Sequence, residues 1–153
     1  MIRSLLASCA LALCIPATTQ ADILDGVIDA EVLPGWREDG ARHYAALRIK
    51  LASGWKTYWR APGDAGIPPR FDWSASQNLA AVATQWPVPE VFRDNGMRSI
   101  GYANEVTIPL HLKARDTSKP VHLQAHVQIG VCEVICVPAD FSIEAVLPVR
   151  GQN

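Results

Sequence analysis

The sequence predicts an all-β fold, an immunoglobulin-like antiparallel β-sandwich, and three observations support this prediction. Short runs of alternating apolar residues recur along the chain, glycine and proline cluster between them, and no stretch shows the ~3.6-residue period of a convincing helix. In the clearest run, residues 121–131, every second residue from Val121 onward is apolar. A strand with one buried face has this period of two, and many such strands joined by turns are typical of a sandwich.

The predicted strands follow one another in chain order with turns between them. The first two are separated by turn-forming residues between positions 34 and 40. An aromatic strand then leads into residues 61–69, where the density of proline and glycine excludes a helix. Pro109 suggests an edge strand or a bulge. The predicted strands are residues 27–33, 43–51, 54–60, 71–73, 79–86, 102–112, 121–131 and 141–147.

Residues 87–101 are the longest stretch without a clear period, so we expect an irregular segment there. The segment is rich in turn-forming residues but carries the large apolar side chains of Phe92 and Met97. Long irregular segments of compact domains are often functional.

The first residues predict a secretory signal peptide. Arg3 precedes an apolar run, residues 5–15, and Thr19-Gln20-Ala21 supplies small residues at a cleavage point. The run is shorter than the ~20 residues that cross a bilayer. We therefore expect residues 1–21 to be cleaved and residues 22–153 to form a single exported domain without stable membrane insertion. A lipoprotein cleaved before Cys9 is the alternative.

The charge balance gives no indication of a nucleic-acid partner. The formal net charge is −1, and it becomes −2 when Arg3 is lost with the signal peptide, because no acidic residue precedes Asp22. Domains that bind nucleic acid or anionic membrane surfaces usually carry a basic surplus. We therefore expect proteins or small solutes as partners.

Cys132 and Cys136 are the candidate site. Cleavage would remove Cys9 and Cys14 and leave this pair, with three residues between its members, at the end of the clearest strand. In an exported protein an isolated pair indicates a disulfide or a redox couple. Opposed positions at a hairpin tip place two Cα atoms about 4.5–5.5 Å apart, which a disulfide tolerates.

Three roles are compatible with this pair. A structural staple would contribute little, because so short a loop gains well under the ~3 kcal/mol of a 15-residue loop. Copper(I) or zinc could bind both thiolates together with His122, His126 or His111, although a solvated strand face also carries histidines. The third role is electron exchange with another thiol. The alternative to exchange is therefore a non-catalytic copper-binding or protein-interaction domain with a structural disulfide.

The neighbours of the pair predict a guarded redox centre. Val131, Val134, Ile135 and Val137 are apolar, Glu133 is acidic, and no lysine or arginine is adjacent in the sequence. Apolar surroundings and negative charge both disfavour a thiolate. We therefore expect a carrier that reacts slowly with random oxidants and is activated when a partner docks.

Four motifs span most of the mature chain in order. They are Trp55-x-Thr57-Tyr58-Trp59-Arg60-x-Pro62-Gly63-Asp64-x-Gly66-x-Pro68, then Gln85-Trp86-Pro87-x-Pro89, then Gly101-Tyr102 with Val106-x-Ile108-Pro109-Leu110, and Cys132-Glu133-x-x-Cys136-x-Pro138. Together they resemble the N-terminal periplasmic domain of the disulfide reductase DsbD. The short cysteine spacing is similar to that of its ScsB-type relatives.

The resemblance implies a periplasmic thiol–disulfide oxidoreductase of immunoglobulin-like fold, with a redox-active disulfide and no other cofactor. Its cysteines would accept electrons from a membrane-embedded donor and pass them to thioredoxin-like proteins. The family's second cysteine, which forms the mixed disulfide with the partner, corresponds to Cys136, so Cys132 would resolve it. The family's shielding loop would lie within residues 93–102. Because the chain ends with the β domain, we expect both partners to act in trans.

Other motif residues have less direct roles. We expect the large aromatics, Tyr58 included, to build the core, since such side chains dominate protein interiors. The segment Pro62-Gly63-Asp64 could border the partner-binding surface. The candidates for shielding or partner contact are Met97, Ile100, Tyr102, Glu133 and Pro138.

Overall fold

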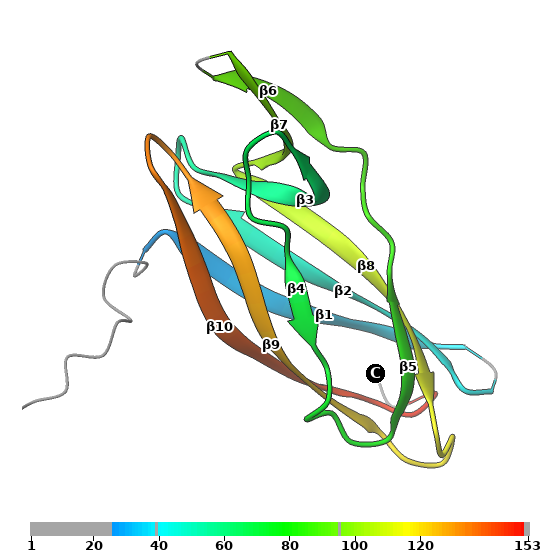
Figure 1. Ribbon diagram of the computed structural model, residues 1–153. Helices are drawn as coiled ribbons and strands as arrows, with labels where there is room; N and C mark the ends of the chain where they lie inside the picture. Colours follow the sequence, from blue (N-terminus) through cyan, green and yellow to red (C-terminus); the bar gives the residue numbers. More distant parts are fainter. Residues whose placement is uncertain (1–25, 39, 95, 152–153) are drawn as a thin grey trace, which may run out of the picture.

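The computed structural model describes residues 26–38, 40–94 and 96–151, which form two β-sheets packed face to face (Figure 1). In chain order the strands are β1 Ile28–Arg37, β2 Arg42–Leu51, β3 Lys56–Gly63, β4 Arg70–Asp72, β5 Leu79–Thr84, β6 Glu90–Asp94, β7 Met97–Ala103, β8 Glu105–Ala114, β9 Val121–Cys132 and β10 Cys136–Leu147.

The two sheets confirm the predicted antiparallel sandwich. One sheet has the order β1-β2-β8-β5, and the other has the order β10-β9-β3-β7-β6 with β4 paired to β9. Every pairing among these strands is antiparallel. The fold is therefore all-β and immunoglobulin-like.

The core lies between the inward faces of the two sheets, where the alternation in the sequence predicts it. In β9 the apolar residues from Val121 to Val131 are buried while the histidines and glutamines between them are exposed. The most deeply buried large apolar residues are Leu47, Ile49, Ile108, Leu110, Leu123, Ile129, Leu147, Val121, Val127 and Val131.

The prediction of an irregular segment at residues 87–101 is wrong, because this part of the chain contains a β-hairpin. β6 and β7 pair from Glu90 opposite Gly101 to Asp94 opposite Met97. Most β6 residues are exposed, so the strand has no buried face to impose an alternating pattern. The Asn95-Gly96 dipeptide was the available signal, since this pair favours a two-residue hairpin turn.

The prediction of one strand over residues 102–112 is also wrong. The chain leaves the six-stranded sheet after Ala103 and enters the four-stranded sheet at Glu105. Asn104 makes this step with a positive φ of 62°, and its backbone carbonyl accepts a hydrogen bond from the Leu51 amide at 2.6 Å. Asparagine tolerates the left-handed region better than most residues, so it can interrupt an otherwise alternating run.

Pro109 does not mark an edge strand, because β8 lies between β2 and β5. The Pro109 carbonyl accepts a hydrogen bond from the Gln85 amide at 2.9 Å, just beyond the end of β5 at Thr84. In an antiparallel sheet the N–H and C=O of one residue point toward the same neighbouring strand. The missing N–H of Pro109 therefore points toward Gln85, where the regular pairing of β8 with β5 has ended.

The connections of the sandwich gather at its two ends. The β9–β10 tip, the β2–β3 connection and the β6–β7 hairpin lie at one end, and the β1–β2 and β8–β9 connections lie at the other (Figure 1). The predicted signal peptide, with Cys9 and Cys14, lies outside the described residues. Within the described ranges, no helix is both long and apolar enough to cross a membrane.

Candidate functional site

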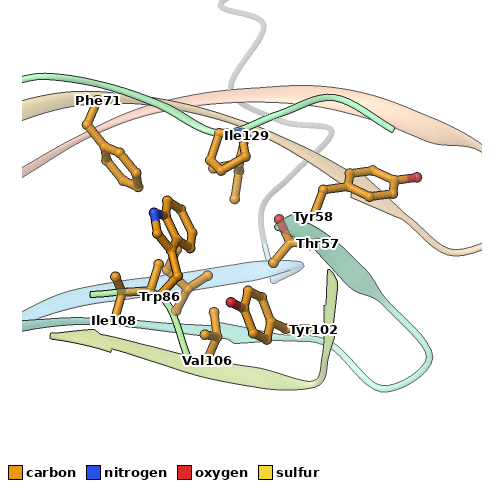
Figure 2. A pocket seen from close by; sticks show the side chains of 10 residues that line it. Thr57, Tyr58, Phe71, Trp86, Tyr102, Val106, Ile108 and Ile129 are labelled. Carbon is orange, nitrogen blue, oxygen red and sulfur yellow. The ribbon is translucent and has the colours of Figure 1, made fainter. Parts of the chain in front are cut away.

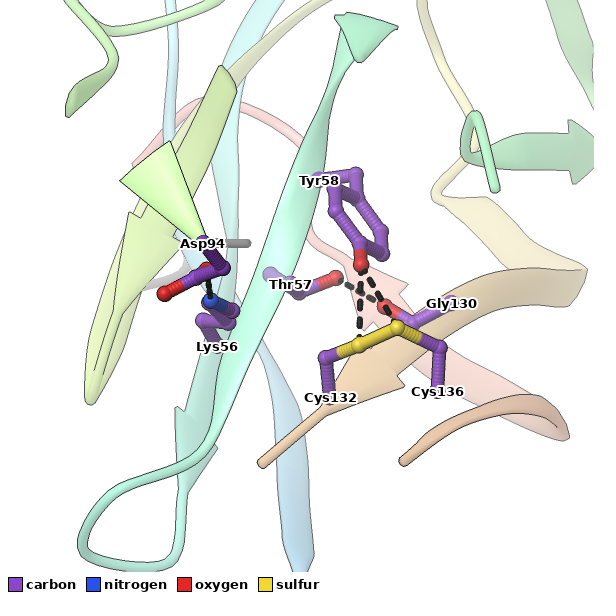
Figure 3. The surroundings of a disulfide bond; sticks show 7 residues. All are labelled: Lys56, Thr57, Tyr58, Asp94, Gly130, Cys132 and Cys136. Carbon is purple, nitrogen blue, oxygen red and sulfur yellow. Dashed lines mark hydrogen bonds and ion pairs between the residues drawn. A yellow bond between two sulfur atoms is a disulfide. The ribbon is translucent and has the colours of Figure 1, made fainter. Parts of the chain in front are cut away.

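Cys132 and Cys136 form a disulfide at the tip of the β9–β10 hairpin (Figure 3). Cys132 ends β9, Cys136 begins β10, and the two residues are directly opposed in the strand register. Their Cα atoms are 4.1 Å apart. The hairpin predicted from the sequence therefore places the two cysteines opposite each other.

The two cysteines differ in their exposure to solvent. Cys132 is buried, with 3% of its surface exposed, whereas Cys136 is exposed. Beside Cys136 the tip presents two apolar side chains, Val134 with 91% and Ile135 with 73% of their surface exposed. An attacking thiolate can thus approach Cys136, while the protein surrounds Cys132.

The disulfide lies on the outer face of the six-stranded sheet. Thr57 is opposite Val131, and both are buried between the sheets. The next pair, Lys56 opposite Cys132, must then face outward, because successive residues of a strand alternate between its faces. Tyr58, two residues after Lys56, projects from the same outer face as the disulfide.

The Tyr58 hydroxyl contacts both sulfur atoms of the disulfide (Figure 3). Its oxygen is 2.9 Å from Cys132 Sγ and 3.0 Å from Cys136 Sγ. The hydroxyl is the donor in both contacts, because a disulfide sulfur carries no hydrogen. Although Tyr58 was predicted as a core residue and is buried, with 3% exposed, its hydroxyl belongs to the site.

The Tyr58 ring packs closely against two glycines. A Cβ atom added to Gly66 would lie 2.7 Å from the ring, and one added to Gly130 would lie 3.0 Å from it and 2.6 Å from Ile67 Cβ. No side chain fits at these distances without displacing the ring or the loop. The proline- and glycine-rich segment after β3 therefore folds back over Tyr58 and buries it.

Hydrogen bonds anchor this segment and β3 to their neighbours. The Asp64 carboxylate accepts a hydrogen bond from the Arg98 amide at 3.1 Å, and the Asp64 amide donates to the Arg98 carbonyl at 2.8 Å. The Thr57 hydroxyl donates to the Gly130 carbonyl at 2.8 Å. These bonds fix the loop to β7 and fix β3 to β9 beside the disulfide.

The electrostatic surroundings keep the Tyr58 hydroxyl protonated. Burial raises the pKa of Tyr58 above its ordinary value, and the nearby Asp94 carboxylate raises it further. Asp94 forms an ion pair with Lys56, whose ammonium group lies 5.1 Å from the centre of the Phe92 ring. The structure thus places the cationic Lys56 opposite Cys132, although no lysine or arginine is adjacent to Cys132 in the sequence.

Three residues of the 93–102 segment were predicted to shield the disulfide, and they occupy different environments. Tyr102 faces the interior of the sandwich and lines a narrow cavity with Trp86 and Phe71, while the Tyr58 ring points away from this group (Figure 2). The Tyr102 hydroxyl donates a hydrogen bond to the Pro87 carbonyl at 2.9 Å, and burial raises the pKa of Tyr102 to about 12. Met97 is 50% exposed and Ile100 is half-buried on β7. A shielding role for these residues stays a prediction.

The two remaining predicted contact residues lie beside the disulfide on exposed positions. Glu133 is at the hairpin tip, where its carboxylate lies against the turn at Gly54. Pro138 is opposite Gly130 on β10, an edge strand, where the missing N–H of proline is tolerated. A role of Glu133 and Pro138 in partner contact stays a prediction.

Two of the three histidines considered as metal ligands have other side-chain partners, and the third, His122, is exposed on β9. His126 pairs with Asp140 at 3.2 Å, and His111 lies on β8, in the other sheet, 2.9 Å from Gln85 Oε1. Over the described part of the chain, no three or more His, Cys, Asp or Glu side chains gather in a way that could hold a metal ion.

Comparisons with known proteins relate the chain to a family. The ScsB N-terminal periplasmic domain from Proteus mirabilis is 28% identical, with a TM-score of 0.63 over 82% of this chain and 48% of that chain. This chain therefore spans about half the length of the ScsB structure. The reduced N-terminal domain of Neisseria meningitidis DsbD shares the fold, at 14% identity and a TM-score of 0.52 over 84% of this chain and 91% of that one.

A search of curated proteins found no match. In contrast, a family model matches residues 29–148, that of the N-terminal domain of the thiol:disulfide interchange protein DsbD. The match includes all ten strands, except for the first residue of β1. The chain therefore belongs to the DsbD N-terminal domain family.

Proposed function

We propose that this domain relays reducing equivalents in the periplasm by thiol–disulfide exchange through Cys132 and Cys136. In the proposed reaction a partner thiolate attacks Cys136, and Cys132 leaves and later resolves the mixed disulfide. The observation that carries the proposal is the unequal exposure of the two sulfur-bearing residues, 3% for Cys132 against an exposed Cys136, in a disulfide at a hairpin tip. Exchange requires the attacking sulfur to reach one sulfur in line with the bond.

Family membership supports the identity of the partners. The ScsB relative is described as a periplasmic domain, and the DsbD family is named for thiol:disulfide interchange. We infer that electrons come from a membrane-embedded donor and go to thioredoxin-like periplasmic proteins. A purely structural disulfide would stabilise the fold only slightly here, because closing so short a loop removes little entropy from the unfolded chain.

Trapping with single-cysteine variants tests this proposal. In Cys132→Ala the exposed Cys136 keeps its thiol but loses its resolving partner, so a mixed disulfide with a thioredoxin-like protein should accumulate. The matched variant Cys136→Ala retains only the buried Cys132 of the pair and should trap much less. Equal trapping by both variants, or none by either, would contradict the assigned roles.

A further inference from the structure

Breaking the disulfide creates a buried negative charge. When a thiolate attacks Cys136 Sγ, a new S–S bond forms between the two, and the Cys132–Cys136 bond breaks. The electron pair of the broken bond stays on Cys132 Sγ, which becomes a thiolate. Cys132 is only 3% exposed, so water cannot solvate this charge well, and an uncompensated buried anion is costly.

We propose that Tyr58 is a catalytic residue of this exchange, whose hydroxyl donates a hydrogen bond to the Cys132 thiolate as the disulfide opens. The hydroxyl is already in place, 2.9 Å from Cys132 Sγ, before any charge develops. Donors aligned in advance with a developing anion lower a barrier because they need no reorganisation during the reaction. The partner that attacks Cys136 rests on the proposed function, whereas the action of Tyr58 applies to any attacking thiol.

The structure holds this hydroxyl at the sulfur atoms. The Tyr58 ring lies against Gly66 and Gly130, neither of which has room for a Cβ atom. Asp64 ties the covering loop to β7 through its two hydrogen bonds to Arg98. The ring therefore has little freedom to turn the hydroxyl away when the S–S bond breaks.

The protonation state of Tyr58 suits a donor. Burial and the Asp94 carboxylate raise its pKa above the ordinary value, so the hydroxyl keeps its proton at neutral pH. A thiol has an ordinary pKa near 8.5, which lies below that of tyrosine. We therefore assign the proton to Tyr58 and the charge to Cys132, which makes the interaction a hydrogen bond to a thiolate and not a proton transfer.

The same hydrogen bond acts in both directions of exchange. It helps Cys132 to leave when a thiolate attacks Cys136, and it keeps Cys132 ionised for its own attack on the mixed disulfide. Tyr58 should therefore accelerate opening and closing together, while the burial of Cys132 beside the exposed Cys136 decides which sulfur is released.

Tyr58→Phe, which removes one oxygen atom, tests the inference. In the protein purified after export, the rate of disulfide reduction by dithiothreitol should fall about tenfold, because hydrogen bonds to charged groups are among the stronger ones. In a Cys136→Ala background the pKa of Cys132, followed by thiolate absorbance, should rise by about one unit when Tyr58 is replaced. A role in packing alone would leave this pKa unchanged.

Tyr44→Phe is the matched control. It also removes a tyrosine hydroxyl, but Tyr44 lies on β2 in the four-stranded sheet, where its ring stacks on Trp36. Its reduction rate and Cys132 pKa should match those of the parent protein. If Tyr58→Phe gives a folded protein with the parent rate and the parent Cys132 pKa, the proposed role is wrong.

A second variant covers the case in which Tyr58→Phe does not fold. Gly66→Ala keeps the hydroxyl but places a Cβ atom 2.7 Å from the ring, so it should displace the hydroxyl and slow reduction in the same way. An unchanged rate in folded Gly66→Ala would then count against the inference. Dithiothreitol needs no protein partner, so these outcomes are independent of the trapping test of the proposed function.

Discussion

The side chain of Thr57 joins β3 to β9. Only two residues of β3, Lys56 and Thr57, pair with β9, and the Thr57 hydroxyl adds a buried hydrogen bond to the Gly130 carbonyl. Replacing Thr57 with Val keeps the shape but leaves this carbonyl without its donor. We expect Thr57→Val to lower the free energy of unfolding by about 1–3 kcal/mol, measured by urea denaturation.

Thr107→Val is the matched control for this prediction. Thr107 is exposed on β8, so removing its hydroxyl should change the free energy of unfolding by no more than about 0.5 kcal/mol. If the two variants unfold at the same urea concentration, the Thr57 bond does not hold β3 in place.

Individual residues of the site differ in how far the sequence could predict them. Cys132 and Cys136 are predictable because only three residues lie between them at a hairpin tip, which is a local relation. Tyr58 is not, because it is distant from both cysteines in the sequence and reaches them only when β3 pairs with β9. Its neighbour Thr57 points into the core. The register of the β3–β9 pairing decides whether Thr57 or Tyr58 points inward.

The β9–β10 tip is the element that we expect a partner protein to contact. Val134 and Ile135 are exposed between the cysteines, and a protein that approaches Cys136 must cover them. Burying such side chains favours association by about 1.5–3 kcal/mol each at most. The double variant Val134→Ser, Ile135→Ser should therefore slow exchange with a thioredoxin-like protein several-fold, measured by stopped-flow fluorescence.

Two comparisons separate docking from chemistry in this experiment. The double variant should react with dithiothreitol at the parent rate, because a small dithiol does not contact the tip. Val146→Ser changes a 57% exposed valine on the same strand, far along β10 from the disulfide, and should leave both rates unchanged. Equal slowing of the protein and the small-molecule reactions would show that the tip affects the disulfide itself.

Strands that bury every second residue were predicted well, whereas the exposed strand β6 was missed. β2 and β9 bury every second residue, so their alternation is visible in the sequence. The exposed β6 shows no such pattern, and the β7–β8 boundary at Asn104 is hidden because the apolar residues on its two sides, Tyr102 and Val106, are in the same phase of the alternation. The assignment of strands to sheets depends on long-range pairing, which local patterns do not encode.

At the scale of the whole molecule, the end opposite the disulfide carries a buried polar cluster. His43 is fully buried, and its Nε2 atom contacts the Pro34 carbonyl. Arg37 lies opposite it on β1 and donates to the carbonyls of Thr117 and Lys119. The cluster joins the β1–β2 connection to the β8–β9 connection and closes this end of the sandwich.

His43 should make the fold sensitive to acid. Burial lowers its pKa below the ordinary value of 6.5, and the Arg37 charge lowers it further, against a raising effect of the Pro34 carbonyl. The unfolded chain therefore binds more protons than the folded one between these pKa values. We expect the free energy of unfolding to fall as the pH drops through about 6.5, until the folded pKa is reached.

Replacing single histidines checks the source of this acid sensitivity. Urea denaturation at pH 7.5 and pH 5.5 should show a smaller loss of stability for His43→Gln than for the parent protein. His122→Gln, which changes an exposed histidine on β9, should retain the parent loss. An undiminished loss in His43→Gln would assign the acid sensitivity to other groups.

The reduction potential of the Cys132–Cys136 couple tests the central claim most directly. It can be measured by equilibrating the purified protein with dithiothreitol or glutathione redox buffers and quantifying the free thiols. An exchange-active couple should have a potential within the range of known exchange proteins, roughly −120 to −270 mV. A potential below about −300 mV, typical of structural disulfides, would contradict the account.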